Sequence, residues 1–459
     1  MTGQGLQDFL RGYEAAHPAD VYTVDRPVSL DQDITAVVWE LAERGHHPLL
    51  RFRRVAGADR EVVTNLFASR ARIGRMLGAQ PGELHDRYQR LAAGAMPVAE
   101  LDDGPITDRV DAGDRVDLRS LPLLTHFATD LGPYITSGIV VAEDAGGGHG
   151  NLSYHRSVVA SPTSLGTSLH SRGDLWRLLQ DAAASGKRLP VAMVIGAHPL
   201  FMLAASARVA FGVDEREIAG GLLGEPLEVV RTPTHGLRVP AAAEVVIEGD
   251  IDPAVEEDEG PFGEFSGYSS DRSTRNRIEV CTVMQRKDAV WLDVVGGNSH
   301  EHLNLGRVPR EAEMTAKLKD RFGSVAALHY PRSGTHFHCY VAVDQRRPGE
   351  ARQVLLGLLG WDPYLKTAVA VDPDVDITND SEVLWALATH FQPDRDMIVI
   401  DGLPGSALDP SAGKLGTTSR LALDATRGEG FDAQRIRVSE SARAVGREIA
   451  AQRAGTPSD

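Results

Sequence analysis

Residues 258–268 read DEGPFGEFSGY and place two carboxylates, Glu259 and Glu264, around a Gly-Pro-Phe-Gly bend. Pro261 fixes its own φ and biases the residue before it toward extended backbone, and Gly263 permits a turn where a β-carbon would clash. The loop therefore has a defined shape that orients its two flanking carboxylates. Two carboxylates in different environments suit general acid–base chemistry. On this stretch alone, a surface turn with ordinary acids is the commoner interpretation.

A second polar stretch, GNLSYHRSVV, leads into an expected strand near residue 150. Within a short span it supplies amide, hydroxyl, imidazole and guanidinium groups, which suit a ligand that carries phosphate or carboxylate. The side chains concerned are those of Asn151, Ser153, Tyr154, His155 and Arg156. A polar strand end with an exposed arginine is the commoner interpretation, so these residues are candidates and not yet a site.

Two further residues are candidate metal ligands. His170 lies in SLHSRGD and Glu215 lies in FGVDEREIAGG, and each taken alone is typical of a solvated surface position. Hard divalent cations need several oxygen ligands, and manganese also accepts histidine, so Asn151, His170 and Glu215 would form a site if the fold brings them together. The sequence has no Walker loop, no GxGxxG opening a helix and no GxSxG elbow.

Hydrophobic periodicity indicates which elements must position these groups. From about residue 135 the chain is strand-rich, at YITSGIVVAED, PVAMVIGA and AAEVVIEGD, and RIEVCTVMQRKDAVWLDVVGG reads as a hairpin turned at RKD. One strong helix is expected among them, at DLWRLLQDAAASG, with Asp174 placed to cap it. Strands with few intervening helices favour a barrel-like β domain over a parallel Rossmann sheet.

The flanking regions mix helices and strands. SLDQDITAVVWELAERG predicts a helix with Ser29 and Gln32 in capping-box spacing and Gly45 as its stop. A helix starting near Pro309 connects the β domain to a smaller α/β unit, and the tail ends in an amphipathic helix typical of oligomer-facing or docking elements. The predicted fold class is therefore mixed, α+β with α/β. Its parts are an N-terminal α/β segment, the β domain, the connecting helix and the C-terminal α/β domain, at residues 1–110, 111–308, 309–325 and 326–459.

Composition narrows the possible partners. The 459 residues are 42% hydrophobic and 24% charged, which is ordinary for soluble globular proteins. A formal net charge of −16 argues against nucleic acid and against anionic membranes. No apolar run approaches the ~20 residues that span a bilayer, and no signal segment is evident, so we predict a cytoplasmic protein without a membrane span. Cys281 and Cys339 do not form a disulfide framework.

Taken together, five motifs resemble the UbiD family of reversible decarboxylases: EGPFGEFSGY, NLSYHR, LPVAMVIGAHP, LEVVRTPTHGLRVPAAAEVVIEGDIDP and DATR. The resemblance covers roughly residues 115–430. It implies prenylated FMN, a divalent metal (Mn²⁺ or Mg²⁺) and commonly K⁺, bound in a split-barrel-like domain. It also implies a flavin prenyltransferase as the supplier of the cofactor and a homodimer or higher homo-oligomer, assembled largely through the smaller C-terminal domain.

The resemblance also implies roles for individual residues. Arg156 and Glu259 would form a charged, hydrogen-bonded pair beside the cofactor, and Glu264 would donate the proton that replaces the lost CO₂. The bend would then leave Glu264 facing substrate in a drier place, where it can be protonated near neutrality. The metal ligands would be Asn151, His170 and Glu215, with the glutamate bridging metal and flavin phosphate. The implied cofactor-binding set is Asn151, Ser153, Tyr154, His155, Arg156, His170, Ser206 and Glu215.

The implied reaction is the non-oxidative decarboxylation of an α,β-unsaturated or (hetero)aromatic carboxylic acid. Loss of CO₂ from an sp² carbon leaves a carbanion that side chains alone cannot stabilise, so a cofactor must hold the charge. The expected pocket-lining stretches are GGNSHEHLNLG, with His300 and His302, and DGLPGSALDPS, around Leu403 and Leu408. A histidine there would suit a substrate with a hydroxyl or ring nitrogen, although a structural or solvent-facing role fits these histidines equally well.

Three other classes remain open from the sequence. A flavin-binding protein that does another reaction has no evident need for Arg156, Glu259 and Glu264 together. An accessory subunit of a larger assembly would not need the complete set. A metal-dependent hydrolase would turn over with metal and without flavin.

Overall fold

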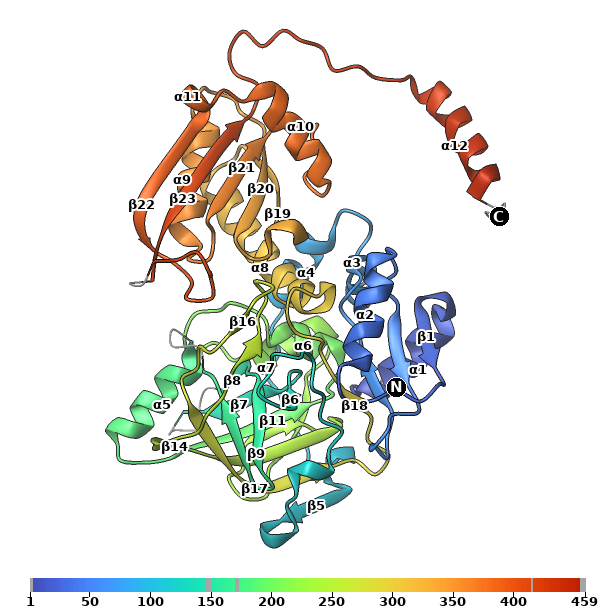
Figure 1. Cartoon of the computed structure of the whole chain (residues 1–459), viewed down its shortest axis with the longest axis vertical. Coiled ribbons are helices and arrows are strands. Elements are labelled where there is room, and N and C mark those ends of the chain that lie inside the picture. Colours follow the sequence, from blue (N-terminus) through green and yellow to red (C-terminus); the bar gives the residue numbers. More distant parts are fainter. Residues whose placement is uncertain (1–2, 145–149, 170–172, 414–415, 455–459) are drawn as a thin grey trace.

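The computed structural model describes residues 3–144, 150–169, 173–413 and 416–454. Two lobes stand one above the other, and the long helix α8 (His300–Arg321) runs between them (Figure 1). The lower lobe contains the N-terminal segment and the β domain, and the upper lobe contains the C-terminal α/β unit (Figure 1).

A large antiparallel sheet organises the lower lobe. All of its strand pairings are antiparallel. Bulges interrupt the long pair β14–β17, one of them beside Gly249, where an added β-carbon would lie 2.2 Å from a backbone oxygen. Bulges bend and twist a sheet, so this one curls into a half barrel. In sheet order the strands are β6 (Tyr134–Ile135), β9 (Ser157–Ser161), β10 (Ser164–Thr167), β17 (Asn276–Gln285), β14 (Val245–Glu256), β11 (Leu189–Ile195), β7 (Ile139–Glu143) and β8 (Gly150–Tyr154), with β5 (Arg109–Ala112) beside β17.

The central strand β11 shows why this sheet is buried on both faces. Its sequence LPVAMVI is almost continuously apolar, and successive side chains of a strand point to opposite faces. Ala192 and Val194 join one hydrophobic core, whereas Val191, Met193 and Ile195 join the other. Helices from the N-terminal segment and from the β domain supply the second layer of both cores.

The helices of the lower lobe divide between the two cores. One core contains residues of α1 (Leu6–Ala16), α3 (Arg70–Leu77), α4 (Leu84–Ala92), α6 (Pro199–Ala204) and α7 (Glu215–Leu223). The other contains residues of α2 (Asp33–Glu43) and α5 (Asp174–Ala184). Short 3-10 turns lie at Pro18–Asp20, Pro105–Thr107, Gly113–Arg115 and Leu118–Ser120.

Smaller sheets complete the lower lobe. The first has the order β1 (Val21–Val24), β2 (Leu49–Phe52), β3 (Val62–Thr64) and β18 (Trp291–Leu292). The second has the order β13 (Arg238–Pro240), β12 (Glu228–Arg231) and β4 (Ala99–Glu100). The third pairs β15 (Phe262–Gly263) with β16 (Ser269–Ser270).

The helix predicted near residue 30 is present, but its predicted capping box is wrong. Gln32 is the N-cap residue and has a left-handed backbone with φ 65°, and no side chain caps the helix. The Ser29 backbone N–H instead donates to the Asp33 carboxylate, at 2.8 Å. Gly45 follows the helix with φ 76°, as expected for its stop. Asp174 likewise is the first residue of α5 and not its cap, which is Gly173.

The predicted hairpin at RKD is also wrong. β18 pairs in parallel with β3 of the N-terminal segment, through Trp291 and Val62, and not with β17. The Trp291 side chain is fully buried between elements far apart in sequence. Burial of this large indole outweighs the local pairing that the pattern favours.

The connecting helix α8 begins at His300, earlier than the sequence indicated. The Ser299 hydroxyl caps it by accepting from the His302 backbone N–H, at 3.2 Å, and Pro309 lies inside the helix. Leu305, Val308 and Ala312 belong to a core of the lower lobe, whereas Met314 and Leu318 belong to the core of the upper lobe. A single helix is thus packed into both lobes.

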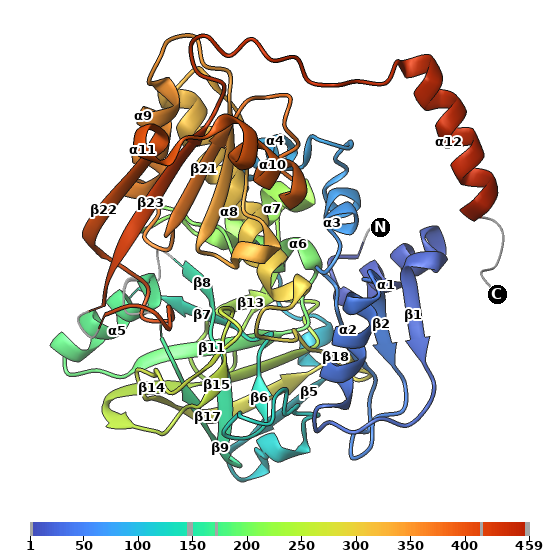
Figure 2. The same cartoon turned by 45° about the horizontal axis from the view of Figure 1, so that its top comes forward.

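The upper lobe is a sheet with helices on both faces (Figure 2). Ala368 and Ala370 face the core that contains α9, and Val369 and Val371 face the core that contains α10. This unit and the curled sheet confirm the predicted mixed fold. In order, the strands are β19 (Val325–His329), β20 (His338–Val343), β21 (Thr367–Val371), β23 (Thr417–Ala425) and β22 (Met397–Pro404); the helices are α9 (Glu350–Trp361), α10 (Asp380–His390) and α11 (Pro393–Asp396), with a 3-10 turn at Arg332–Gly334.

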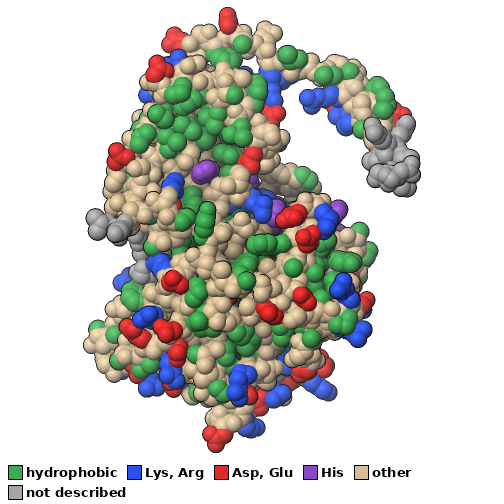
Figure 3. All heavy atoms as spheres, in the orientation of Figure 1, with side chains coloured by type: hydrophobic (Ala, Val, Ile, Leu, Met, Phe, Trp, Pro, Cys, Tyr) green, Lys and Arg blue, Asp and Glu red, His purple; other side chains and the backbone are tan. Residues whose placement is uncertain are grey.

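Two features stand out at the surface of the molecule. Hydrophobic side chains gather on the upper lobe (Figure 3), where Met397 and Val399 of β22 are about half exposed and lie opposite Leu423 and Leu421 of β23. The amphipathic tail helix α12 (Glu440–Ala454) stands away from both lobes at the end of an extended segment (Figures 1 and 2). Among the described residues, no helix combines the length and the apolar character that crossing a bilayer requires.

A buried ion pair fastens α8 to the upper lobe and yields a stability prediction. Arg310 donates to both carboxylate oxygens of Asp362, and the Tyr330 hydroxyl donates to the same carboxylate at 2.6 Å. We predict that Asp362→Ala lowers the free energy of unfolding by about 3–5 kcal/mol, because it leaves a buried guanidinium without its counter-charge. Denaturant titration measures this change. The exposed pair Arg44–Glu40 is the control, and Glu40→Ala should cost less than about 1 kcal/mol; equal effects of the two variants would contradict the prediction.

Candidate active site

Arg156 lies at the centre of the charged groups that the sequence singled out. It joins β8 to β9, and its Nε and Nη2 donate to the two oxygens of Glu259, at 2.7 and 3.2 Å. The Glu259 side chain is fully buried, and the Phe262 ring lies 4.8 Å from the Arg156 guanidinium carbon. A two-pronged pair of this kind fixes both side chains and compensates their burial.

Glu264 contacts the same arginine. Nη1 of Arg156 donates to Oε1 of Glu264, so one guanidinium serves both carboxylates. The family resemblance implied only Glu259 as a partner of Arg156, and the contact with Glu264 is additional. The two carboxylates still differ, because Glu264 lines a cavity and Glu259 is sealed behind it.

Residues of the 127–131 loop hold the bend between the two glutamates in place. Gly263 donates its backbone N–H to Asp130, at 3.0 Å, and Leu131 donates to the Pro261 carbonyl, at 2.8 Å. A β-carbon on Gly263 would lie 2.3 Å from the Phe127 ring, so only glycine fits at this point. Gly260 has φ 119° and not the extended backbone expected before Pro261. Packing against the 127–131 loop holds the bend in its observed shape.

Arg156 and Glu264 line a cavity of about 290 Å³. Its wall also contains Tyr154 and His155, which directly precede Arg156, and predicted residues from three other parts of the chain: Ser206, His302 and Leu408. Sequence reasoning missed further lining residues, among them Thr136, Phe262, Arg272 and His336. We call this space the reaction cavity.

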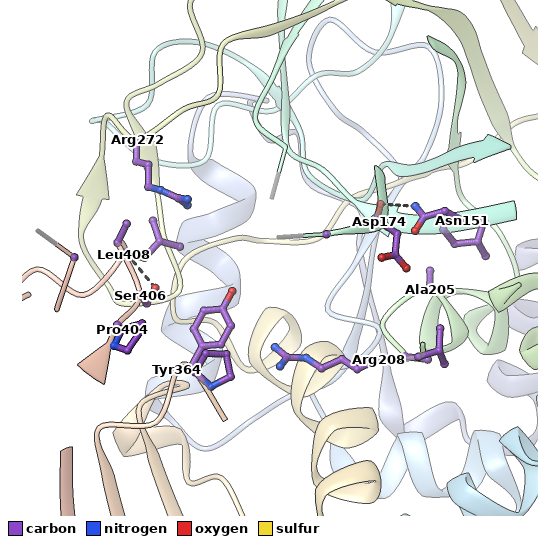
Figure 4. Close-up of a pocket in the computed structure, with 18 of the residues that line it drawn as sticks. Asn151, Asp174, Ala205, Arg208, Arg272, Tyr364, Pro404, Ser406 and Leu408 are labelled. Carbon is purple, nitrogen blue, oxygen red and sulfur yellow. Dashed lines mark hydrogen bonds between the residues drawn. The ribbon is translucent and has the colours of Figure 1, made fainter. Parts of the chain in front are cut away.

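A second cavity of about 700 Å³ adjoins the first, since Arg272 and Leu408 line both. Asn151, Ser153 and Glu215 line it from the lower lobe. Figure 4 shows Arg272, Ser406 and Leu408 on one side and Asn151 and Asp174 on the other, with Tyr364 and Arg208 below. Because the upper lobe contributes residues 363–364 and 404–408, the cavity lies between the lobes. We call it the interlobe cavity.

A hydrogen-bonded chain orients Asn151 on β8. The Nδ1 of His155 lies 3.1 Å from the Ser168 carbonyl, which can only accept, so Nδ1 carries the proton and Nε2 accepts from the Ser153 hydroxyl at 2.9 Å. The Ser153 oxygen then accepts from the Asn151 side-chain amide, at 3.1 Å. This series of hydrogen bonds uses the side-chain NH₂ group of Asn151. The side-chain carbonyl oxygen of Asn151 remains available to another partner.

Glu215 is a buried carboxylate at the start of α7. One oxygen accepts from the Leu152 backbone N–H at 3.0 Å, and no cationic side chain pairs with it within the described residues. Burial raises its pKa to about 7, as expected for a carboxylate that lacks a counter-charge. Oxygen donors from Glu215 and Asn151 around one cavity fit a hard divalent cation. In the described part of the chain, no three His, Cys, Asp or Glu side chains converge on a metal position.

Three of the predicted residues lie elsewhere. His170 is outside the described residues. His300 lines a separate cavity with His47, whose ring centroid is 4.0 Å from its own. Leu403, on β22, lines neither the reaction cavity nor the interlobe cavity.

Arg272 is the most informative residue that the sequence interpretation missed. Its backbone carbonyl accepts from Arg156, at 2.7 Å, while its guanidinium has no hydrogen bond or ion pair among the described residues. It lies in the loop SSDRSTRNR directly after the bend, where basic residues following an acidic motif were the available signal. A cation without a partner beside two cavities can bind an anion.

Known proteins share both the sequence and this architecture. Three models of 3-octaprenyl-4-hydroxybenzoate carboxy-lyase match in order: the N-terminal domain at residues 16–92, the Rift-related domain at 97–299 and the C-terminal domain at 303–425. An anhydromevalonate phosphate decarboxylase of Aeropyrum pernix is 31% identical over 420 residues, which is 90% of this chain and 93% of that protein.

Solved structures of similar proteins have the same fold. The UbiD-class enzyme HmfF from Pelotomaculum thermopropionicum, in complex with FMN, is 31% identical with a TM-score of 0.89, covering 96% of this chain and 98% of that chain. An evolved dimeric form of HmfF, in complex with prFMN, is 30% identical with a TM-score of 0.86, covering 96% and 100%. These matches extend over both lobes and the helix between them, and the predicted family is confirmed: the chain belongs to the UbiD family of carboxy-lyases.

Proposed function

We propose that this protein decarboxylates an α,β-unsaturated or (hetero)aromatic carboxylic acid, reversibly and without net oxidation, with prenylated FMN as its cofactor. The observation that carries the proposal is the arrangement of Arg156 between two carboxylates, only one of which, Glu264, lines the reaction cavity. When bound, prenylated FMN supplies the electron sink that an sp² carbon needs as CO₂ leaves.

The interlobe cavity suits the phosphate end of such a cofactor. Asn151 and Glu215 would hold a divalent cation, Mn²⁺ or Mg²⁺, through oxygen atoms, with His170 as the third ligand and K⁺ nearby. The unpaired Arg272 and the exposed Arg208 add positive charge to the same cavity, which favours a phosphate. Ser153, Tyr154, His155 and Ser206 are the further cofactor contacts that we propose.

Arg156 and Glu264 would act on the substrate in sequence. A substrate carboxylate that reaches Nη1 of Arg156 competes with Glu264 for that donor. The displaced Glu264, now beside a second negative charge, takes up a proton more readily. As the bond between the substrate carbon and CO₂ breaks, Glu264 gives this proton to the carbon, and solvent restores it. Glu259 keeps the arginine in place throughout.

The proposal also includes the oligomeric state of the protein and the source of its cofactor. The half-exposed apolar face of β22 and β23 would be covered in a homodimer or higher homo-oligomer. A flavin prenyltransferase in the same compartment, the cytoplasm, would provide the cofactor. Mass and absorption spectra of the flavin released after co-expression with such an enzyme test this step; plain FMN or no flavin in folded protein would favour the hydrolase or accessory alternatives.

A phosphorylated unsaturated acid is a second candidate substrate. Curated relatives of this chain include anhydromevalonate phosphate decarboxylases, and the free Arg272 guanidinium at the wall of the reaction cavity would suit a substrate phosphate. Turnover of an acid that carries a phosphate, and of no acid without one, would favour this candidate.

The proton donor can be tested directly. We predict that Glu264→Gln, in cofactor-loaded protein, lowers the rate of CO₂ release and of solvent deuterium exchange into the product by about 10²–10⁴-fold, because an amide cannot donate the proton. Asp258→Asn is the matched control, since Asp258 is an exposed carboxylate in the same loop. Full activity of Glu264→Gln, with flavin content unchanged, would rule out its role.

The cation site can be tested by its retention of cofactor. We predict that Glu215→Ala loses most of its bound flavin and divalent metal after co-expression with a flavin prenyltransferase, because the variant removes the charged oxygen ligand. Glu217→Ala, two residues along the same first turn of α7, should keep both. Flavin-to-protein absorbance ratios and metal mass spectrometry measure the difference; equal loading of the two variants would contradict the assignment.

A further inference from the structure

A third cavity, of about 290 Å³, shares no lining residue with the reaction cavity or the interlobe cavity. The helix α2, the segment after it and the loop before α8 line this cavity from the lower lobe. Arg332, in the 3-10 turn that follows β19, lines it from the upper lobe. We call it the α2 cavity.

Several N–H groups in the wall of the α2 cavity have no protein partner. The Arg332 guanidinium makes no hydrogen bond or ion pair with any described residue. Across the same described ranges, the rings of His47 and His300 and the side-chain amide of Asn298 make no hydrogen bond either. Polar groups that a fold gathers in one place usually pair with one another or with a bound group. These donors are therefore free to bind an acceptor from outside the chain.

The wall of the α2 cavity has a positive charge opposite two neutral rings. The ring centroids of His47 and His300 lie 4.0 Å apart. Burial lowers the pKa of His47, and it lowers the pKa of His300 to about 3, with Arg332 acting in the same direction on both rings. Glu43, which is exposed, is the single carboxylate among the described lining residues. An anion would thus supply the counter-charge that Arg332 lacks.

We propose that the α2 cavity is a binding site for a small tetrahedral oxyanion, a phosphate or sulfate group, held between Arg332 of the upper lobe and His47 and His300 of the lower lobe. The site lies apart from the reaction cavity, so the inference goes beyond the proposed function and does not depend on it.

The chemistry of the wall favours this class of ligand. A guanidinium and imidazole N–H groups are donors that match phosphate oxygens. A tetrahedral group has oxygens in several directions and can accept from donors on different elements at once, whereas a carboxylate has two oxygens in one plane. A cation placed in the same cavity would be repelled by Arg332.

The indole of Trp39 gives the α2 cavity an apolar side. Trp39 lines the cavity, is 42% exposed and packs against Phe127, with ring centroids 5.5 Å apart. An aromatic phosphate ester could stack on this indole, and an inorganic anion could not. The oxyanion can therefore come from two sources, an inorganic ion or an organic phosphate, which share the chemistry of the site.

Histidine resonances test the proposal directly. In protein labelled with ¹³C-histidine, the ring signals of His47 and His300 are identified by their loss in His47→Gln and His300→Gln. Both signals should shift along one saturable curve when sodium sulfate is added at constant ionic strength, with a millimolar or tighter dissociation constant. Arg332→Gln should weaken binding by at least about 10-fold, because it removes the charged donors.

Two further variants control for general effects of charge. Arg346→Gln removes an exposed arginine of the same lobe that does not line the α2 cavity, and it should leave the dissociation constant unchanged. Glu43→Gln should tighten binding by about 2- to 5-fold, because it removes the negative charge in the wall. Absence of a saturable shift in the wild-type protein, or equal affinities of Arg332→Gln and Arg346→Gln, would overturn the proposal.

The pH dependence of sulfate binding is a second test. Bound sulfate raises the lowered pKa values of the two rings, so proton uptake accompanies binding. Affinity should therefore increase as the pH falls from about 8 to about 5.5, a range in which sulfate keeps its charge. The double variant His47→Gln, His300→Gln should lose this dependence; an unchanged dependence would overturn the role of the rings. The other charged or titratable groups near the rings are Glu43, His46, Arg72, Arg307 and Arg332.

Phenyl phosphate distinguishes the two sources of the oxyanion. Tighter binding of phenyl phosphate than of inorganic phosphate, with the difference lost in Trp39→Leu, would identify an organic phosphate as the ligand. Equal binding of the two would identify an inorganic anion. Both results support the site, whereas binding of neither, as judged by the His47 and His300 signals, would overturn it.

Discussion

The candidate active site depends on one largely buried guanidinium that must satisfy two carboxylates. Arg156 has lost most of its contact with water, so its charge is stable only because Glu259 takes two of its donors and Glu264 a third. This requirement explains the bend between the glutamates. Phe127 and Asp130 hold Gly263 in a conformation that brings both acids to one arginine.

The strand β8, which ends two residues before Arg156, also carries the proposed cation ligand Asn151. Asn151 and Ser153 of β8 line the interlobe cavity, and Tyr154, His155 and Arg156 line the reaction cavity. One short run of backbone therefore sets the distance between the two cavities. The far wall of the interlobe cavity belongs to the upper lobe, so α8, which packs into both lobes, fixes how closely that wall approaches.

The sequence predicted helices and strands well where local hydrophobic periodicity determines them. It predicted them poorly where contacts between distant parts of the chain determine them. The strand β11 and the helix α2 follow from their apolar patterns. The hairpin expected before Trp291 failed because that indole is buried against a strand more than two hundred residues earlier. His300 and His302 looked equivalent in sequence, yet two positions on a helix lie about 200° apart around its axis, and the two rings enter different cavities. Arg272 has no periodic signal, since it lies in a loop.

The balance of charge around Arg156 links proton transfer in the proposed reaction to the binding of the substrate carboxylate. One guanidinium faces two carboxylates, so this group already has an excess of one negative charge. A substrate carboxylate adds a second, in a place where water screens poorly. Uptake of a proton by Glu264 relieves that excess, and departure of CO₂ removes the substrate charge while the proton moves to carbon. The arginine is thus left with the same two carboxylates, and the reverse reaction meets the same balance. In the proposed mechanism, one cation shared by two acids would couple substrate binding to proton delivery.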